Sequence, residues 1–188
     1  MPEYKSDLSY KDISTILLEN RIINLVGEVN DGLAYQITSA LLIMAEESDK
    51  PIQMFINSPG GSVMAGLAII DVMQHIKAPV FTIVTGMAAS MGAAILSAGE
   101  KGHRMALPNA TIMLHQVSAG EGGNIQDMRV GMEFTEKLNT RLMTMIAKNC
   151  KKTLKQLEKD TVRDKWLFAD EALAYGIVDE VVQATTKI

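Results

Sequence analysis

The sequence predicts an α/β domain with a sheet at its centre. Segments with strand-like and helix-like periodicity alternate along the chain, which is typical of that class. Several of the strand-like segments are continuously apolar, as in a sheet covered on both faces. The 188 residues contain no low-complexity linker, charge block or clear repeat, so we expect a single domain over residues 1–188.

The first half of the chain indicates three rounds of helix and strand. We expect helices over 12–20, 32–47 and 63–76 and strands over 22–27, 52–57 and 80–85. Ser58-Pro59-Gly60-Gly61 is a strong turn signal. Residues 78–99 carry no charge and are long enough to span a membrane. Because one proline, three glycines and several hydroxyl groups divide them, we expect a buried strand, a tight turn and a buried helix over 89–98.

The second half indicates shorter elements and one long helix. We expect strands over 103–107, 111–114 and 177–182, and short helices over 153–159 and 169–175. A flexible glycine-containing segment precedes the helix expected over 125–149. That helix is charge-rich and about 37 Å long. It fits a compact layered domain poorly, so we expect it to project and meet another subunit.

Composition excludes several classes of protein. The net charge of −4 argues against a nucleic-acid binder, which normally carries a basic stripe. The single cysteine, Cys150, cannot form an internal disulfide, and no Cys/His cluster has zinc spacing, so no metal site is expected. The polar N-terminus does not resemble a secretory signal. We therefore expect a cytoplasmic protein without a membrane segment.

Ser90 is a candidate nucleophile. It opens the helix expected over 89–98, within the small-residue stretch Gly86-Met87-Ala88-Ala89-Ser90-Met91-Gly92. Taken alone, the pattern favours an ordinary N-cap serine. The alternative is a nucleophile on a strand-to-helix turn, where free N–H groups of the first helical turn stabilise negative charge. The hydrolase pattern G-x-S-x-G does not match, because position 88 is alanine.

A serine nucleophile also needs a base, an acid and an oxyanion hole. His115 ends an apolar strand beside the glycine segment, which suits an accessible base as well as a core histidine. Asp160 and Asp164 are candidate acids, although their spacing alone favours a solvated turn. Gly60 and Gly61 are either a plain turn or a source of exposed backbone N–H groups for an oxyanion.

The ordered set of motifs is more specific than any one of them. They are Phe55-Ile56-Asn57-Ser58-Pro59-Gly60-Gly61, the Ser90 stretch, Met113-Leu114-His115-Gln116, Asp160-Thr161-Val162-Arg163-Asp164 and Tyr175-Gly176-Ile177-Val178-Asp179. From about Tyr10 to Val182 the chain resembles the ClpP family, the proteolytic subunits of ATP-dependent Clp proteases. The resemblance implies a serine endopeptidase with the crotonase-like fold, a superhelix of strand–strand–helix units. It also implies a projecting handle helix within 116–150.

The resemblance assigns roles to residues. It implies a catalytic triad of Ser90, His115 and Asp164, with the backbone N–H groups of Gly60 and Met91 as oxyanion donors. Further roles fall on Gly61, Gln116 and Val117 in substrate binding, on Val162 and Arg163 at an oligomer interface, and on Phe55 in unfoldase docking.

The resemblance also implies an assembly. Two stacked heptameric rings, homo- or hetero-oligomeric, would enclose a chamber that receives polypeptide substrates. An AAA+ unfoldase of the ClpX, ClpC or ClpA type would feed the chamber and consume ATP, so the chain itself needs no cofactor. Neither nucleic acid nor membrane is an expected partner.

Three departures from the family pattern keep alternatives open. Val162 stands where the family usually has aspartate, and Val117-Ser118-Ala119 where it has proline and two glycines. Only nine residues precede Tyr10, where the family has a longer axial segment. The chain could therefore be a paralogue that is active only in a mixed ring with another ClpP isoform. A crotonase-type acyl-CoA enzyme is a second alternative, which would not need the triad.

Overall fold

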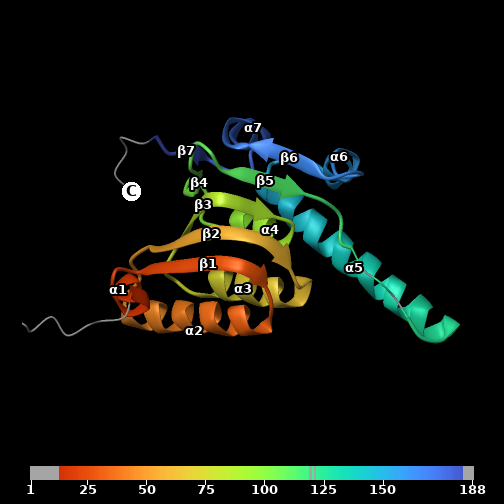
Figure 1. Cartoon of the computed structure of the whole chain (residues 1–188), viewed down its shortest axis with the longest axis horizontal. Coiled ribbons are helices and arrows are strands. Elements are labelled where there is room, and N and C mark those ends of the chain that lie inside the picture. Colours follow the sequence, from red (N-terminus) through yellow and green to blue (C-terminus); the bar gives the residue numbers. More distant parts are fainter. Residues whose placement is uncertain (1–12, 119, 121, 184–188) are drawn as a thin grey trace, which may run out of the picture.

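A computed structural model describes residues 13–118, 120 and 122–183, and it shows a mixed α/β fold with a mostly parallel sheet (Figure 1). Helices and strands alternate as predicted from α1 to β4. The helices are α1 (Ile13–Glu19), α2 (Asp31–Glu47), α3 (Val63–His75), α4 (Met91–Ser97), α5 (Ile125–Asn149), α6 (Leu154–Asp160) and α7 (Ala169–Tyr175). The strands are β1 (Ile22–Val29), β2 (Ile52–Gly61), β3 (Val80–Ala89), β4 (Arg104–Ala106), β5 (Thr111–Leu114), β6 (Lys165–Phe168) and β7 (Glu180–Val181).

The main sheet has the strand order β1-β2-β3-β4-β7, and all of these neighbours are parallel. The helices α2 and α3 lie together along one face of it (Figure 1). Along β1 and β2, buried residues alternate with more exposed ones. The prediction of cover on both faces is therefore wrong for β1, whose sequence is a continuous apolar run, because the connecting helices lie on a single side. In β2 the alternation is the one that its sequence indicates.

Two predicted turns lie within strands. β2 continues through the Ser58–Gly61 motif, because Glu28 and Val29 of β1 pair with its last two residues beyond a bulge at Gly27. β3 likewise runs through Gly86 to Ala89, so the sharp turn lies at Ser90 itself. The division of residues 78–99 into a strand and a helix is confirmed. Of the helices in the described ranges, none has the length and apolar character needed to cross a membrane.

On the side away from β2, strand β3 pairs with two different strands, one along each half. Its first half pairs with β4, and its last residues, Met87–Ala89, pair with β5. β6 then pairs antiparallel with β5. The sequence analysis missed β6, because its four residues are few and its aromatic side chains, Trp166 and Phe168, are exposed. The predicted last strand, 177–182, is reduced to the two residues of β7.

The long helix α5 has two parts. Its C-terminal part packs on the core through Leu142, Met143, Ile146 and Ala147. The rest carries exposed apolar side chains, including Val130, Met132 and Phe134. The helix extends well beyond the sheet (Figure 1), as the charge-rich sequence predicts.

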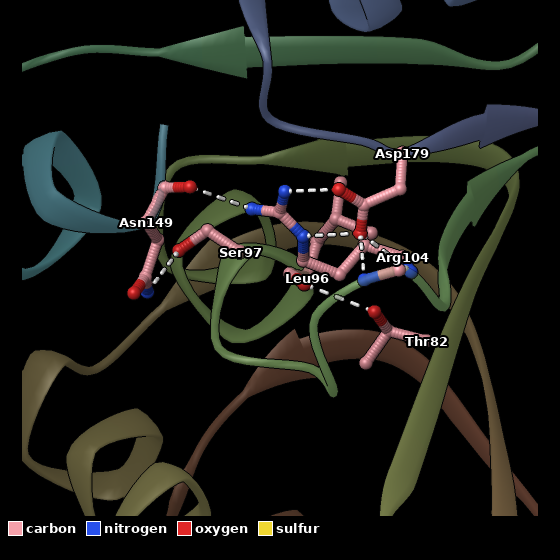
Figure 2. Close-up of polar contacts among 7 residues, drawn as sticks. Thr82, Leu96, Ser97, Arg104, Asn149 and Asp179 are labelled. Carbon is pink, nitrogen blue, oxygen red and sulfur yellow. Dashed lines mark hydrogen bonds and ion pairs between the residues drawn. The ribbon is translucent and has the colours of Figure 1, made fainter. Parts of the chain in front are cut away.

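A buried ion pair joins the end of α5 to the sheet (Figure 2). The Arg104 guanidinium donates to both carboxylate oxygens of Asp179, at 2.7 Å and 2.5 Å, and to the backbone oxygen of Asn149 at 3.0 Å. The side chain of Arg104 is 5% exposed and that of Asp179 is 21% exposed. One side chain thus fixes β4, the residue before β7 and the last turn of α5 relative to one another.

Replacing Arg104 with methionine is expected to lower the free energy of unfolding by about 3–5 kcal/mol, because it leaves the Asp179 carboxylate without its charged partner. This corresponds to a melting temperature lower by roughly 10 °C for a chain of this size. Thermal melting at a fixed protein concentration measures the effect. A melting temperature within 2 °C of the unmodified chain would contradict it.

The same ion pair predicts a pH dependence. Burial opposes ionisation of Asp179, but hydrogen bonds from the side chain and backbone of Arg104 outweigh it, so the pKa of Asp179 lies below its usual value. Its contribution to stability is therefore complete above the pKa of an unfolded aspartate, about 3.9, and is lost as the pH falls through the lower folded value. The unmodified chain should melt at a higher temperature than Asp179→Asn, by an amount that does not change with pH around neutrality. The two melting temperatures should converge below about pH 4. A difference unchanged down to pH 3 would refute this.

Candidate active site

The strand register brings Ser90, His115 and Asp164 to one edge of the sheet. Ser90 follows the last paired residue of β3, and its N–H donates to Met113 O at 2.9 Å. His115 follows Leu114, which pairs with Lys165 at the start of β6. Asp164 immediately precedes Lys165. Because β5 and β6 are antiparallel, the residues just beyond this last pair face each other.

Ser90 has an unusual backbone conformation for a residue with a side chain. Its φ is 54° and its ψ is −119°, values that cost free energy outside glycine. It stands at the N-cap position of α4, but its hydroxyl makes no capping hydrogen bond. The hydroxyl oxygen instead lies 2.7 Å from Nε2 of His115. The ordinary N-cap interpretation therefore does not apply to this serine.

His115 lies between Ser90 and Asp164. Its Nδ1 is 3.8 Å from Oδ1 of Asp164, which is longer than a hydrogen bond. The side chain of His115 is 25% exposed and that of Asp164 is 59% exposed. The serine–histidine contact is thus formed in the single chain, whereas the histidine–aspartate contact is only approached. The alternative acid, Asp160, accepts hydrogen bonds from Tyr175 and Gln156 instead.

The glycine pair lies against Ser90, but its two amides differ. A Cβ on Gly60 would lie 2.7 Å from Ala89 O and 2.9 Å from Met91 N, so only glycine allows this approach. The N–H of Gly60 donates to the buried Ser58 hydroxyl at 3.1 Å. This finding is against the prediction of Gly60 as an oxyanion donor, because its amide is already occupied.

Gly61 presents its amide differently. Its pairing partner in β1 is Val29, and the N–H of the next residue, Ser62, donates to Val29 O at 2.7 Å. Since the amides of successive strand residues point to opposite sides, the N–H of Gly61 points away from β1. Gly61 also lines the cleft beside Ser90, which Gly60 does not.

Two clefts flank the segment that follows His115. The Ser90 cleft has a volume of about 190 Å³, and its lining includes Gly61, Ser90, Met91, His115, Gln116, Val117 and residues of α5. The Asp164 cleft, about 560 Å³, lies between 115–118 and 161–164. Gln116 and Val117, the predicted substrate contacts, line both. The N–H of Val117 is engaged, however, because it donates to Asn139 Oδ1 at 2.9 Å.

Comparison with known proteins decides the family. Residues 5–185 match the Clp protease family. Relatives include the ATP-dependent Clp protease proteolytic subunits of Streptococcus pyogenes serotype M5 (strain Manfredo) and of Streptococcus equi subsp. equi (strain 4047). Each is 48% identical over 182 residues, which cover 95% of this chain and 92% of the relative.

The chain belongs to the Clp protease family. It is a proteolytic subunit, a serine peptidase, and the resemblance seen in the sequence is confirmed. The acyl-CoA alternative has no support among these Clp protease relatives.

The remaining predicted residues of this Clp protease subunit lie in three places. Val162 is 71% exposed, and Arg163 beside it is also exposed. Phe55 is half-buried against a small apolar cluster of Ile83, Met105 and Val182 on the sheet. Their roles in assembly and docking stay predictions. Ala119 and the segment before Tyr10 lie outside the described residues.

Proposed function

We propose that this Clp protease subunit hydrolyses peptide bonds with Ser90 as nucleophile, His115 as general base and Asp164 as the group that orients the imidazole. The observation that carries the proposal is the 2.7 Å contact between Ser90 Oγ and His115 Nε2, made by a serine held at a φ of 54°. A strained serine on a strand-to-helix turn, bonded to an imidazole, is the arrangement of an activated nucleophile.

The reaction follows from this arrangement. Ser90 Oγ attacks the carbonyl carbon of the substrate while His115 Nε2 takes the hydroxyl proton. The imidazolium returns that proton to the leaving amine as the C–N bond breaks, which leaves an acyl-enzyme. A water molecule, deprotonated by the same imidazole, then hydrolyses the ester and restores Ser90. Asp164 favours the tautomer with the proton on Nδ1 and stabilises the imidazolium.

Two backbone amides complete the site. We assign the oxyanion donors to Gly61 and Met91, the former in place of Gly60. Both residues line the Ser90 cleft, and the amide of Met91 belongs to the first helical turn of α4, which lacks an intrahelical acceptor. Each such donor typically contributes about 2.7–4 kcal/mol of transition-state stabilisation. No cofactor takes part in this mechanism.

The wider setting belongs to the same proposal. Residues 1–188 form one crotonase-like peptidase domain, its subunits assemble as two stacked heptameric rings, and the projecting handle helix meets another subunit. An AAA+ unfoldase of the ClpX, ClpC or ClpA type supplies unfolded polypeptides in the cytoplasm. Two features support this view: a single large hydrophobic core to which most helices and strands contribute, and the part of α5 that projects from the sheet. So does the name of the relatives, which are proteolytic subunits of an ATP-dependent Clp protease.

A second candidate is a subunit that becomes active only in a mixed ring with another isoform. Two observations favour it: the 3.8 Å gap between His115 and Asp164, and the exposed Val162 two residues from Asp164. Native mass measurement of the chain alone and with a partner isoform separates the two candidates. A stable and active double ring formed by the chain alone would reject the second one.

Hydrolysis of a fluorogenic peptide, together with labelling by a fluorophosphonate probe, tests the main proposal. We expect the assembled particle to cleave the peptide and to carry the probe on Ser90, located by peptide mass analysis. An assembled particle that cleaves the peptide but is labelled elsewhere would overturn the assignment of Ser90.

A further inference from the structure

The segment after His115 is attached to the handle helix through one side chain. The N–H of Val117 donates to Oδ1 of Asn139, 22 positions further along the chain, at 2.9 Å. Both residues are half-buried. Asn139 lies in α5 one turn before Leu142 and two turns before Ile146, which line the Ser90 cleft. The bond therefore joins the wall of the cleft that carries His115 to the helix beneath it.

Within the part of the chain that the structure describes, no backbone hydrogen bond substitutes for this one. Residues 115–118 belong to no strand or helix. In the described ranges, the backbone of this segment makes a single hydrogen bond, from the N–H of Val117 to Asn139. His115 is the first residue after β5, so the strand fixes its backbone on the N-terminal side and the segment that continues through Gln116 and Val117 fixes it on the other. A shift of the segment therefore also shifts the imidazole.

We propose that Asn139 is a positioning residue, which fixes the segment after His115 against α5 and so holds the imidazole at hydrogen-bonding distance from Ser90. The inference rests on the proposed function of Ser90 and His115. Its physical basis is the hydrogen bond itself: the side-chain oxygen of Asn139 accepts the N–H of Val117, which points from the segment toward α5. Loss of that acceptor also leaves a half-buried N–H without a partner, which disfavours the present position of the segment.

The test is a set of variants compared in the assembled particle. Asn139→Leu removes the acceptor at similar volume, and a misplacement of about 1 Å can cost about a hundredfold in rate. We expect kcat for a fluorogenic peptide, and the rate of labelling of Ser90 by a fluorophosphonate, to fall together by about ten- to a hundredfold. The KM should change much less. Asn139→Asp keeps an acceptor oxygen and should recover most of the activity, while Thr140→Ala, on the exposed side of α5, is the matched control.

Val117→Pro supplies the other half of the test, since proline has no N–H. If Asn139 acts through that N–H, Asn139→Leu should have almost no further effect in the Val117→Pro background. Equal losses in both backgrounds would overturn the inference, and so would an Asn139→Leu variant with unchanged kcat and labelling rate. Native mass measurement confirms that every variant is assembled.

Hydrogen exchange separates this inference from the proposed function. The Val117 amide should exchange at least about tenfold faster in Asn139→Leu than in Asn139→Asp, whether or not the particle is active. If the probe labelled a residue other than Ser90, the proposed function would fail. The exchange rates would still show whether Asn139 holds the segment after His115 against α5. Equal exchange in the two variants would overturn the inference even in an active particle.

Discussion

Replacing Ser90 with alanine is expected to lower kcat for peptide hydrolysis by about 10⁶-fold in the assembled particle. The variant loses the oxygen that lies 2.7 Å from His115 Nε2 and that would form the acyl-enzyme. The oxyanion donors and the cleft would remain, so any residual rate should come from a water molecule attacking the bound substrate. Alanine is smaller than serine, and the hydroxyl makes no capping bond, so α4 should keep its position.

The measurement is steady-state hydrolysis of a fluorogenic peptide, with the particle mass checked for each variant. Ser39→Ala, in the middle of α2, is the matched control and should hydrolyse the peptide at the unmodified rate. Ser90→Ala should also lose all labelling by a fluorophosphonate. Peptide turnover that survives the change at Ser90 would remove the basis of the proposed mechanism.

Periodicity was sufficient for the main helices and for the parallel strands, because one face of each is apolar and buried. It failed at β6, a strand whose alternate side chains Trp166 and Phe168 stay exposed in the single chain. This short strand matters for function, since its pairing with β5 places Asp164 opposite His115. The residues left Asp160 and Asp164 as candidate acids and the resemblance chose Asp164, but only the register explains how Asp164 reaches the site.

The site shows the same division between what a pattern can and cannot predict. Small residues around Ser90 indicated a tight turn, and the structure locates that turn at Ser90 rather than at Gly86. Which amide of the glycine pair is free depends on a bulge in β1 and on the Ser58 hydroxyl, neither of which has a sequence signature. Asn139 was likewise missed, since an asparagine inside a helix signals nothing about a partner 22 positions away.

Replacing Asp164 with asparagine is expected to lower kcat by about 10⁴-fold, the cost of the same change in the serine-protease triad. For Nε2 of His115 to accept the Ser90 proton, Nδ1 must carry a proton, and a carboxylate facing Nδ1 favours that tautomer. The asparagine side chain can turn its NH₂ group toward Nδ1, which favours the opposite tautomer. The change is nearly isosteric, and Asp164 is largely exposed, so stability should be almost unaffected.

Asp160→Asn is the matched control, because Asp160 ends α6 only a few residues before Asp164 and only Asp164 faces His115. Asp160 is engaged by Tyr175 and Gln156, so its replacement should leave kcat within about twofold of the unmodified value and act on stability instead. The comparison also tests the distance of 3.8 Å between Nδ1 of His115 and Oδ1 of Asp164, which is longer than a hydrogen bond in the single chain. If Asp164 closes on His115 when subunits assemble, Asp164→Asn loses about 10⁴-fold only in the assembled particle. Equal activities of the two variants in that particle would show that the imidazole is oriented by some other group.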